Sequence, residues 1–152
     1  MPQTEFDIRA IKLGRDVTAE DVCEDLEFLD DWEERYRYII DLGKQLPPMP
    51  EALRTEDRFV RGCQSQVWLV TEYDGDADTL YLAVESDALI VRGLGAIILT
   101  ALNGKTPKEV ADYDMDGFFE RIDLLRHLSP TRGNGLLAMV GRIKQEAATL
   151  AA

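Results

Sequence analysis

The feature that most constrains the fold is a nearly unbroken apolar run between Ala88 and Leu102. Its interruptions are Arg92, Gly93, Gly95 and Thr100. The run has 15 residues, which is fewer than the roughly 20 that a helix needs to cross a bilayer. We therefore expect a buried central helix. Gly93 and Gly95 would let this helix pack closely on a sheet, which offsets their poor helix propensity.

The chain before this run predicts a β-hairpin. Residues 66–73 alternate in the manner of a strand, 74–76 form an Asp-Gly-Asp turn signal, and 80–85 predict the returning strand. Helical patterns flank the hairpin on both sides in sequence, at about 18–29, 31–44, 88–102, from 106 onward, 118–125 and 129–150. The sequence therefore predicts an α+β fold in which a small antiparallel sheet packs against several helices.

The same patterns predict the domain organisation. Residues 1–17 mix charged and apolar side chains without a clear period, so we expect a flexible N-terminal extension there. Residues 18–152 contain no repeat, low-complexity tract or linker, and their length suits one domain.

The charge balance excludes several kinds of partner. With 17 Lys and Arg against 29 Asp and Glu, the chain carries a formal net charge of −12. Such a surface repels phosphate, so we expect neither nucleic-acid binding nor docking on an anionic membrane. The first residues contain neither the basic nor the apolar part of a secretory signal. We therefore expect a cytoplasmic protein with reduced thiols.

The small number of metal-binding residues limits the inorganic chemistry. A structural zinc site uses four Cys or His ligands, and an iron–sulfur cluster uses several thiolates. Cys23, Cys63 and His127 are the only such residues in the sequence. We expect no resident metal or cofactor.

Cys63 is the most unusual reactive group. It follows Gly62, which permits a positive φ angle, and precedes the polar Gln64 and Ser65 at the start of a predicted strand. Arg61, two residues before it, would favour a thiolate and hence a nucleophile, and Arg58 lies close by. The alternative is a buried structural cysteine.

Cys23 differs from Cys63 in its sequence context. It lies in a predicted helix and precedes a Glu-Asp pair. Nearby carboxylates disfavour a thiolate, so we expect this thiol to pack in the protein and to react slowly.

Two other positions have an alternative functional interpretation. His127 would complete a Cys–His dyad with Cys63, with Asn134 orienting the ring, or would make structural hydrogen bonds. Arg132, in the first turn of a predicted helix that also contains Gly133 and Gly135, opposes the helix dipole. Such a departure from local rules indicates either a functional site or a frayed helix start with the arginine in solvent.

Five segments can now be read together, and they resemble the SufE-like family of sulfur acceptors for cysteine desulfurases. The segments are 62–68, GCQSQVW; 86–94, SDALIVRGL; 127–132, HLSPTR; 32–36, WEERY; and 39–43, IIDLG. The resemblance covers about residues 25–150. It implies an α+β fold similar to that of IscU-type scaffolds.

The resemblance also implies a function. Cys63 would take persulfide sulfur from a SufS-like cysteine desulfurase, stimulate that enzyme, and deliver the sulfur to a SufBCD-like scaffold for iron–sulfur cluster assembly. Pyridoxal phosphate would belong to the desulfurase, and this chain would hold no cofactor. The two-cysteine count fits a carrier and not a scaffold that ligates a cluster itself.

The implied mechanism assigns supporting roles to the neighbours of Cys63. In the family the cysteine loop is similar to a retractable arm, for which Gly62 fits the hinge. Residues 67–69 and 88–102 would supply apolar walls around the sulfur. Arg61 and Arg132 are the candidate cations, and Gln64 and Ser65 belong to the loop itself. Asp87 would cap or precede the helix of the apolar run, or would contact the partner.

Two other classes of function stay open at this point. The first is a free-standing Cys–His thiol enzyme that uses Cys63 and His127 and turns over without a partner protein. The second is a non-covalent allosteric activator of a desulfurase, which would keep its effect after Cys63 is replaced by serine.

Overall fold

The computed structural model describes residues 6–62 and 65–151. These residues form an α+β fold, as predicted, with one two-stranded antiparallel sheet and six α-helices. The α-helices are α1 (Ala19–Glu27), α2 (Trp32–Gly43), α3 (Leu89–Leu102), α4 (Pro107–Asp112), α5 (Met115–Arg121) and α6 (Pro130–Ala151). The strands are β1 (Val67–Asp74) and β2 (Thr79–Ser86), and short 3-10 helices occur at η1 (Ile8–Ala10), η2 (Glu51–Leu53), η3 (Glu56–Arg58) and η4 (Leu125–His127).

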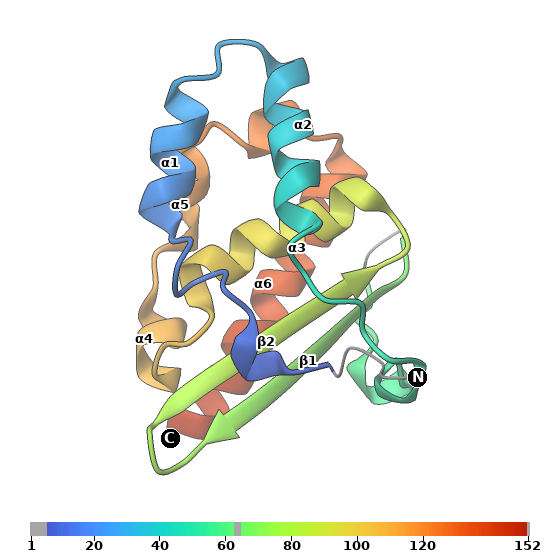
Figure 1. The fold of residues 1–152 in the computed structure, drawn as a ribbon, viewed down its shortest axis with the longest axis vertical. Helices are drawn as coiled ribbons and strands as arrows, with labels where there is room; N and C mark the ends of the chain where they lie inside the picture. Colours follow the sequence, from blue (N-terminus) through green and yellow to red (C-terminus); the bar gives the residue numbers. More distant parts are fainter. Residues whose placement is uncertain (1–5, 63–64, 152) are drawn as a thin grey trace.

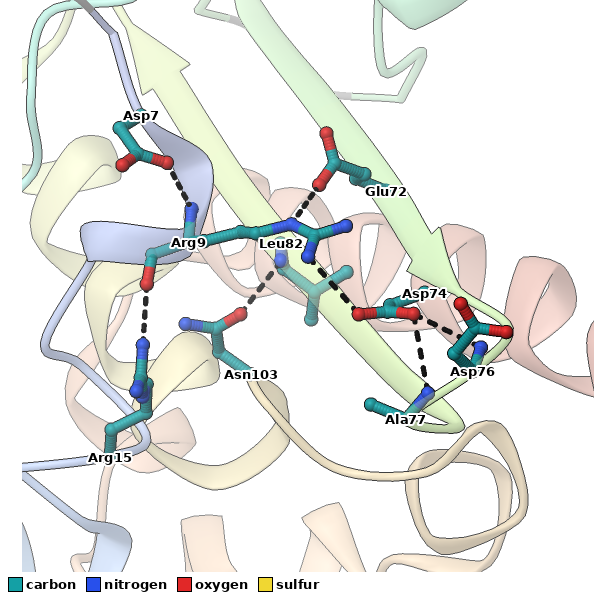
Figure 2. Close-up of polar contacts among 9 residues, drawn as sticks. All are labelled: Asp7, Arg9, Arg15, Glu72, Asp74, Asp76, Ala77, Leu82 and Asn103. Carbon is teal, nitrogen blue, oxygen red and sulfur yellow. Dashed lines mark hydrogen bonds and ion pairs between the residues drawn. The ribbon is translucent and has the colours of Figure 1, made fainter.

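The two strands form the predicted hairpin. Their register runs from Val67 opposite Ser86 to Asp74 opposite Thr79. The Asp74 carboxylate accepts hydrogen bonds from the backbone N–H groups of Asp76 and Ala77 and so closes the turn (Figure 2). Figure 1 shows α6 running along the hairpin and α1 and α2 at the opposite end of the molecule from the turn.

The apolar run forms the central helix α3, and the expectation of burial is confirmed. Every residue of α3 from Gly93 to Leu102 is buried, and the helix packs against α1, α2, α6 and β2. A Cβ at Gly95 would lie 2.7 Å from Val84 Cγ1 in the sheet, as expected. A Cβ at Gly93 would lie 2.3 Å from the Ile39 carbonyl oxygen, so this glycine serves the contact with α2 and not with the sheet.

The charged interruption of the run anchors α3 to the proline-rich turn. Arg92 donates to the Leu46 carbonyl at 2.7 Å, and its Nε lies 3.4 Å from the Glu85 carboxylate. Glu85 also accepts from the Met49 backbone N–H at 3.0 Å. This largely buried ion pair therefore ties α3, β2 and the turn after α2 together.

The expectation of a flexible extension over residues 1–17 is wrong for its described part, 6–17. Ile8, Ile11 and Leu13 are buried in the core. The buried Asn103 accepts from the Leu82 N–H at 2.7 Å and donates to the Leu13 carbonyl at 2.8 Å. Figure 2 shows Arg9 reaching Glu72 and Asp74 of β1. The segment has no regular period because it forms only the short 3-10 helix η1 and is otherwise held by individual contacts.

Candidate functional site

The predicted nucleophile Cys63 and its neighbour Gln64 lie outside the described residues. The positions on either side of them define the site. Before β1, the Val60 N–H donates to the Val67 carbonyl at 2.8 Å, and the Phe59 ring packs edge-on against Trp68 with centroids 5.8 Å apart. The described residues on the two sides of this gap therefore contact each other at the start of β1.

Gly62 has a positive φ angle, which a glycine permits. Its φ is +92°, a value that favours glycine. A Cβ at this position would lie 3.4 Å from the Cβ of Ala138 in α6. The residue that precedes Cys63 thus lies against α6.

Asp87 holds the other end of the segment. It precedes α3, which was one of the expected alternatives, and it does not cap the helix. Its carboxylate accepts a hydrogen bond from the Gln66 N–H at 3.0 Å, and its own N–H donates to the Gln66 carbonyl at 3.4 Å. The residue at the cap position of α3 is Ala88, which has no side-chain oxygen; Ser86 accepts from the Ala88 N–H at 3.2 Å.

A small cavity of about 80 Å³ lies beside these positions. This volume of about 80 Å³ is more than enough for one water molecule, which needs roughly 10–15 Å³ by the same measure. It lies between α3 and α6, and its lining residues are Ser65, Val91, Leu94, Thr131, Arg132, Gly135, Leu136 and Met139. The expected wall from 88–102 is present. The facing wall is formed by α6. We expected residues 67–69 to form part of the wall, but they do not line this cavity.

The two candidate cations have different surroundings. Arg61 forms an ion pair with Glu56 on the surface and lies over the Phe59 ring at 5.9 Å, so its charge already has an acidic partner. Arg132 is exposed at the mouth of the cavity. Among residues 6–62 and 65–151, no hydrogen-bond or ion-pair partner is found for its guanidinium. Its backbone N–H donates to Ser129 Oγ at 3.3 Å, which caps α6.

The contacts of His127 with other described residues are those of a side chain that supports the fold. Its ring stacks on Trp32 with centroids 3.9 Å apart, and its Nδ1 lies 3.0 Å from the Asp123 carbonyl oxygen. Its own carbonyl accepts a hydrogen bond from the Tyr36 hydroxyl. The dyad with Cys63 stays a prediction, because Cys63 lies outside the described residues.

Cys23 is a packed thiol, as predicted. It is 2% exposed in α1. Burial raises its pKa, and the nearby carboxylates of Glu20 and Glu27 raise it further, against an opposing effect of Arg121. These groups favour the protonated, unreactive thiol.

Sequence reasoning singled out Arg132 with Gly133 and Gly135 at the start of α6, but it missed the apolar side chains of α6 that line the cavity. The stripe that includes Leu136 and Met139 has the ordinary period of a core helix, and nothing in it indicates the cavity. Gly135 is the available signal, because a buried glycine in the first turns of a helix permits a close approach of another segment.

Metal clusters and membrane spans are both absent from the described residues. Within this part of the chain, no group of three or more His, Cys, Asp or Glu side chains is arranged to hold a metal ion. No helix formed by the described residues is long and apolar enough to cross a membrane.

Comparisons with known proteins now identify the family. The family model "SufE: Fe-S metabolism associated domain" matches residues 20–147. An uncharacterized SufE-like protein of Rhizobium meliloti (strain 1021) is 52% identical over 132 residues, which is 86% of this chain and 94% of the relative. A second, from Rhizobium etli, is 49% identical over 137 residues, 89% of this chain and 93% of the relative.

A solved structure shows the same fold. The solution structure of a hypothetical protein from Thermus thermophilus superposes with a TM-score of 0.71 at 21% identity, covering 88% of this chain and 96% of that one. The match in sequence along most of the chain, together with this agreement in architecture, leads to one conclusion: the chain belongs to the SufE family.

Proposed function

We propose that this protein is a sulfur acceptor and carrier. Cys63 takes the terminal sulfur of a persulfide on a SufS-like cysteine desulfurase and delivers it to a SufBCD-like scaffold for iron–sulfur cluster assembly, in the cytoplasm. The observation that carries the proposal is the arrangement around Cys63. Hydrogen bonds between Val60 and Val67 and between Gln66 and Asp87 hold the chain on both sides of this residue, and a small cavity lies beside them. The chain also belongs to a family associated with Fe–S metabolism.

The proposed transfer is a displacement at sulfur. The Cys63 thiolate attacks the outer sulfur of the desulfurase Cys–S–SH group, and a new S–S bond forms. The old S–S bond breaks, and its electron pair leaves on the desulfurase cysteine, which takes up a proton. No external oxidant or reductant is needed, because one persulfide replaces another. Pyridoxal phosphate serves the desulfurase, and this chain needs no cofactor for the step.

The residues near Cys63 have defined tasks in this proposal. A free thiol titrates near about 8.5, so a nearby cation raises the reactive thiolate fraction at neutral pH. Arg132, at the cavity mouth and without a described acidic partner, is better suited to this than Arg61, which is paired with Glu56. The apolar side chains from α3 and α6 would shield the persulfide from stray thiols, and Gly62 would act as the hinge.

The same chemistry explains stimulation of the desulfurase. Its active-site cysteine cannot accept another sulfur until the persulfide has been removed. An acceptor that removes the persulfide sulfur therefore raises the turnover of the desulfurase without changing the enzyme's own chemical steps.

Sulfur mapping tests the proposal. The protein is incubated with a cysteine desulfurase, cysteine and pyridoxal phosphate, and the intact protein and its peptides are examined by mass spectrometry. We expect the mass of one added sulfur on the Cys63 peptide, retained in Cys23→Ala and lost in Cys63→Ser. Sulfur on Cys23 alone would refute the assignment.

The alternatives give different results in the same assay. Stimulation that persists undiminished in Cys63→Ser would indicate a non-covalent activator. Thiol-dependent turnover without any partner, abolished by His127→Ala, would indicate a free-standing Cys–His enzyme.

A further inference from the structure

One side chain of α6 holds the segment that leads toward Cys63. Arg142 donates from Nη1 to the Phe59 carbonyl at 3.2 Å and from Nη2 to the Asp57 carbonyl at 2.5 Å. Its Nε lies 3.5 Å from Glu146, one turn further along α6, and Glu146 accepts from Thr71 Oγ1 of β1 at 3.2 Å. A planar guanidinium carries donors on several edges in a fixed geometry, which suits it to bridge two carbonyls and a carboxylate. The segment 57–59, α6 and β1 are thus joined by one set of bonds.

The segment that Arg142 holds has little apolar packing of its own. Residues 51–58 are all exposed or half-buried, and neither η2 nor η3 contains a buried residue. Phe59 follows with its ring against Trp68, and then Val60 bonds to Val67. Because burial contributes little before Phe59, the position of this part of the chain depends strongly on its hydrogen bonds to the rest of the fold.

We propose that Arg142 is a positioning residue for sulfur transfer, acting through the backbone carbonyls of Asp57 and Phe59 on the chain that leads to Gly62 and Cys63. This inference rests on the proposed function. Arg142 contributes no atom or proton to the displacement. It keeps the entering side of the segment in one conformation, as Asp87 does on the leaving side.

The proposal predicts which step of transfer depends on Arg142. Without the two carbonyl bonds, residues 56–59 sample more conformations, and only a fraction of molecules has the arrangement that the desulfurase accepts. The apparent affinity falls in proportion to that fraction, whereas the reaction within the assembled complex is unchanged.

Lys144 provides a matched control. It lies two residues further along the same helix and donates to the carbonyls of Ala111 and Tyr113 at the end of α4. Lys144→Gln therefore removes the same kind of bond from the same helix, but from a different part of the chain.

The experiment measures single-turnover transfer from preloaded desulfurase persulfide to excess acceptor, over a range of acceptor concentrations. Arg142→Gln should raise the half-saturating concentration about tenfold and leave the maximal rate within about twofold. Lys144→Gln should leave both within about twofold, at a comparable loss of thermal stability. Arg142→Lys should be intermediate, because an ammonium has no planar fork. Full recovery in Arg142→Lys would indicate an effect of charge and overturn the positioning role.

A second measurement does not involve the desulfurase. Hydrogen exchange at the Val60 amide reports the bond to Val67 and should be about tenfold faster in Arg142→Gln and unchanged in Lys144→Gln. If Arg142→Gln behaves as Lys144→Gln in exchange and in transfer, while the wild-type protein accepts sulfur, Arg142 is not a positioning residue. If the wild-type protein accepts no sulfur at Cys63, the proposed function fails, and the exchange data show separately whether Arg142 holds the segment.

Discussion

The carboxylate of Asp87 accepts a hydrogen bond from the backbone N–H of Gln66 at 3.0 Å, across a sequence separation of 21 residues. This bond connects the chain just after Cys63 and Gln64 to the residues just before α3. With the Val60–Val67 bond and the two carbonyl bonds of Arg142, it fixes the described residues on both sides of the proposed acceptor cysteine.

Replacing Asp87 should separate the role of its oxygen from the role of its charge. Asp87→Ala removes the acceptor, and we expect sulfur transfer to fall about fivefold, because one bond at an exposed site contributes about 1 kcal/mol to holding the segment. Asp87→Asn keeps a side-chain oxygen and should retain most of the transfer rate. Single-turnover transfer from a preloaded desulfurase checks both variants. Equal losses in the two would show that the negative charge matters and not the hydrogen bond.

The two glycines of α3 and α6 make a matched pair for stability. Gly93→Ala places a Cβ 2.3 Å from the Ile39 carbonyl oxygen, and we expect a loss of about 1–3 kcal/mol or more from overpacking. Gly141→Ala, on the exposed face of α6, meets nothing within 4 Å and should stabilise the protein by about 0.5–1 kcal/mol through helix propensity. Urea unfolding curves for the two variants give both values. A neutral Gly93→Ala would mean that α2 and α3 can move apart easily.

The parts of the fold that were predicted correctly depend on local patterns. The apolar run predicted α3, the alternation of residues 66–73 predicted β1, and the helical pattern from 106 onward predicted α4. Each of these signals lies within one element, so the sequence alone contains it.

The surroundings of the candidate site depend on contacts between distant elements, which no local pattern contains. Arg142 reaches Phe59 across 83 residues, and in the sequence it is simply one of the polar residues of an amphipathic helix. Asp87 shows the same difficulty. The sequence placed it at or before the start of a helix, but gave no sign that the tertiary fold brings the Gln66 amide to its carboxylate. Residues 6–17 lacked a period for a related reason, since ion pairs and Asn103 hold them.

Asn103 should contribute much more to stability than the ion pairs that hold the same N-terminal segment. It is fully buried, and Asn103→Ala leaves the Leu82 N–H and the Leu13 carbonyl without their partner, so we expect a loss of about 2–4 kcal/mol. Arg9→Gln breaks ion pairs of a side chain that is about half exposed and should cost much less than Asn103→Ala. Thermal or urea unfolding distinguishes them. A loss in Arg9→Gln as large as that in Asn103→Ala would contradict this ranking.

The buried thiol of Cys23 should make the free energy of unfolding fall measurably at alkaline pH. Because burial raises the pKa of Cys23 in the folded state, the folded protein keeps this proton at a pH where the unfolded chain has released it. The stabilisation is therefore complete below the unfolded pKa of about 8.5 and is lost as pH rises above it, by up to about 1.4 kcal/mol per pH unit. The test compares the single variant Cys63→Ser, in which Cys23 is the remaining thiol, with the double variant that also carries Cys23→Ala. Between about pH 8.5 and 10 the free energy of unfolding should fall more steeply in the single variant. Parallel pH profiles for the two proteins would show that Cys23 titrates alike in the folded and unfolded states.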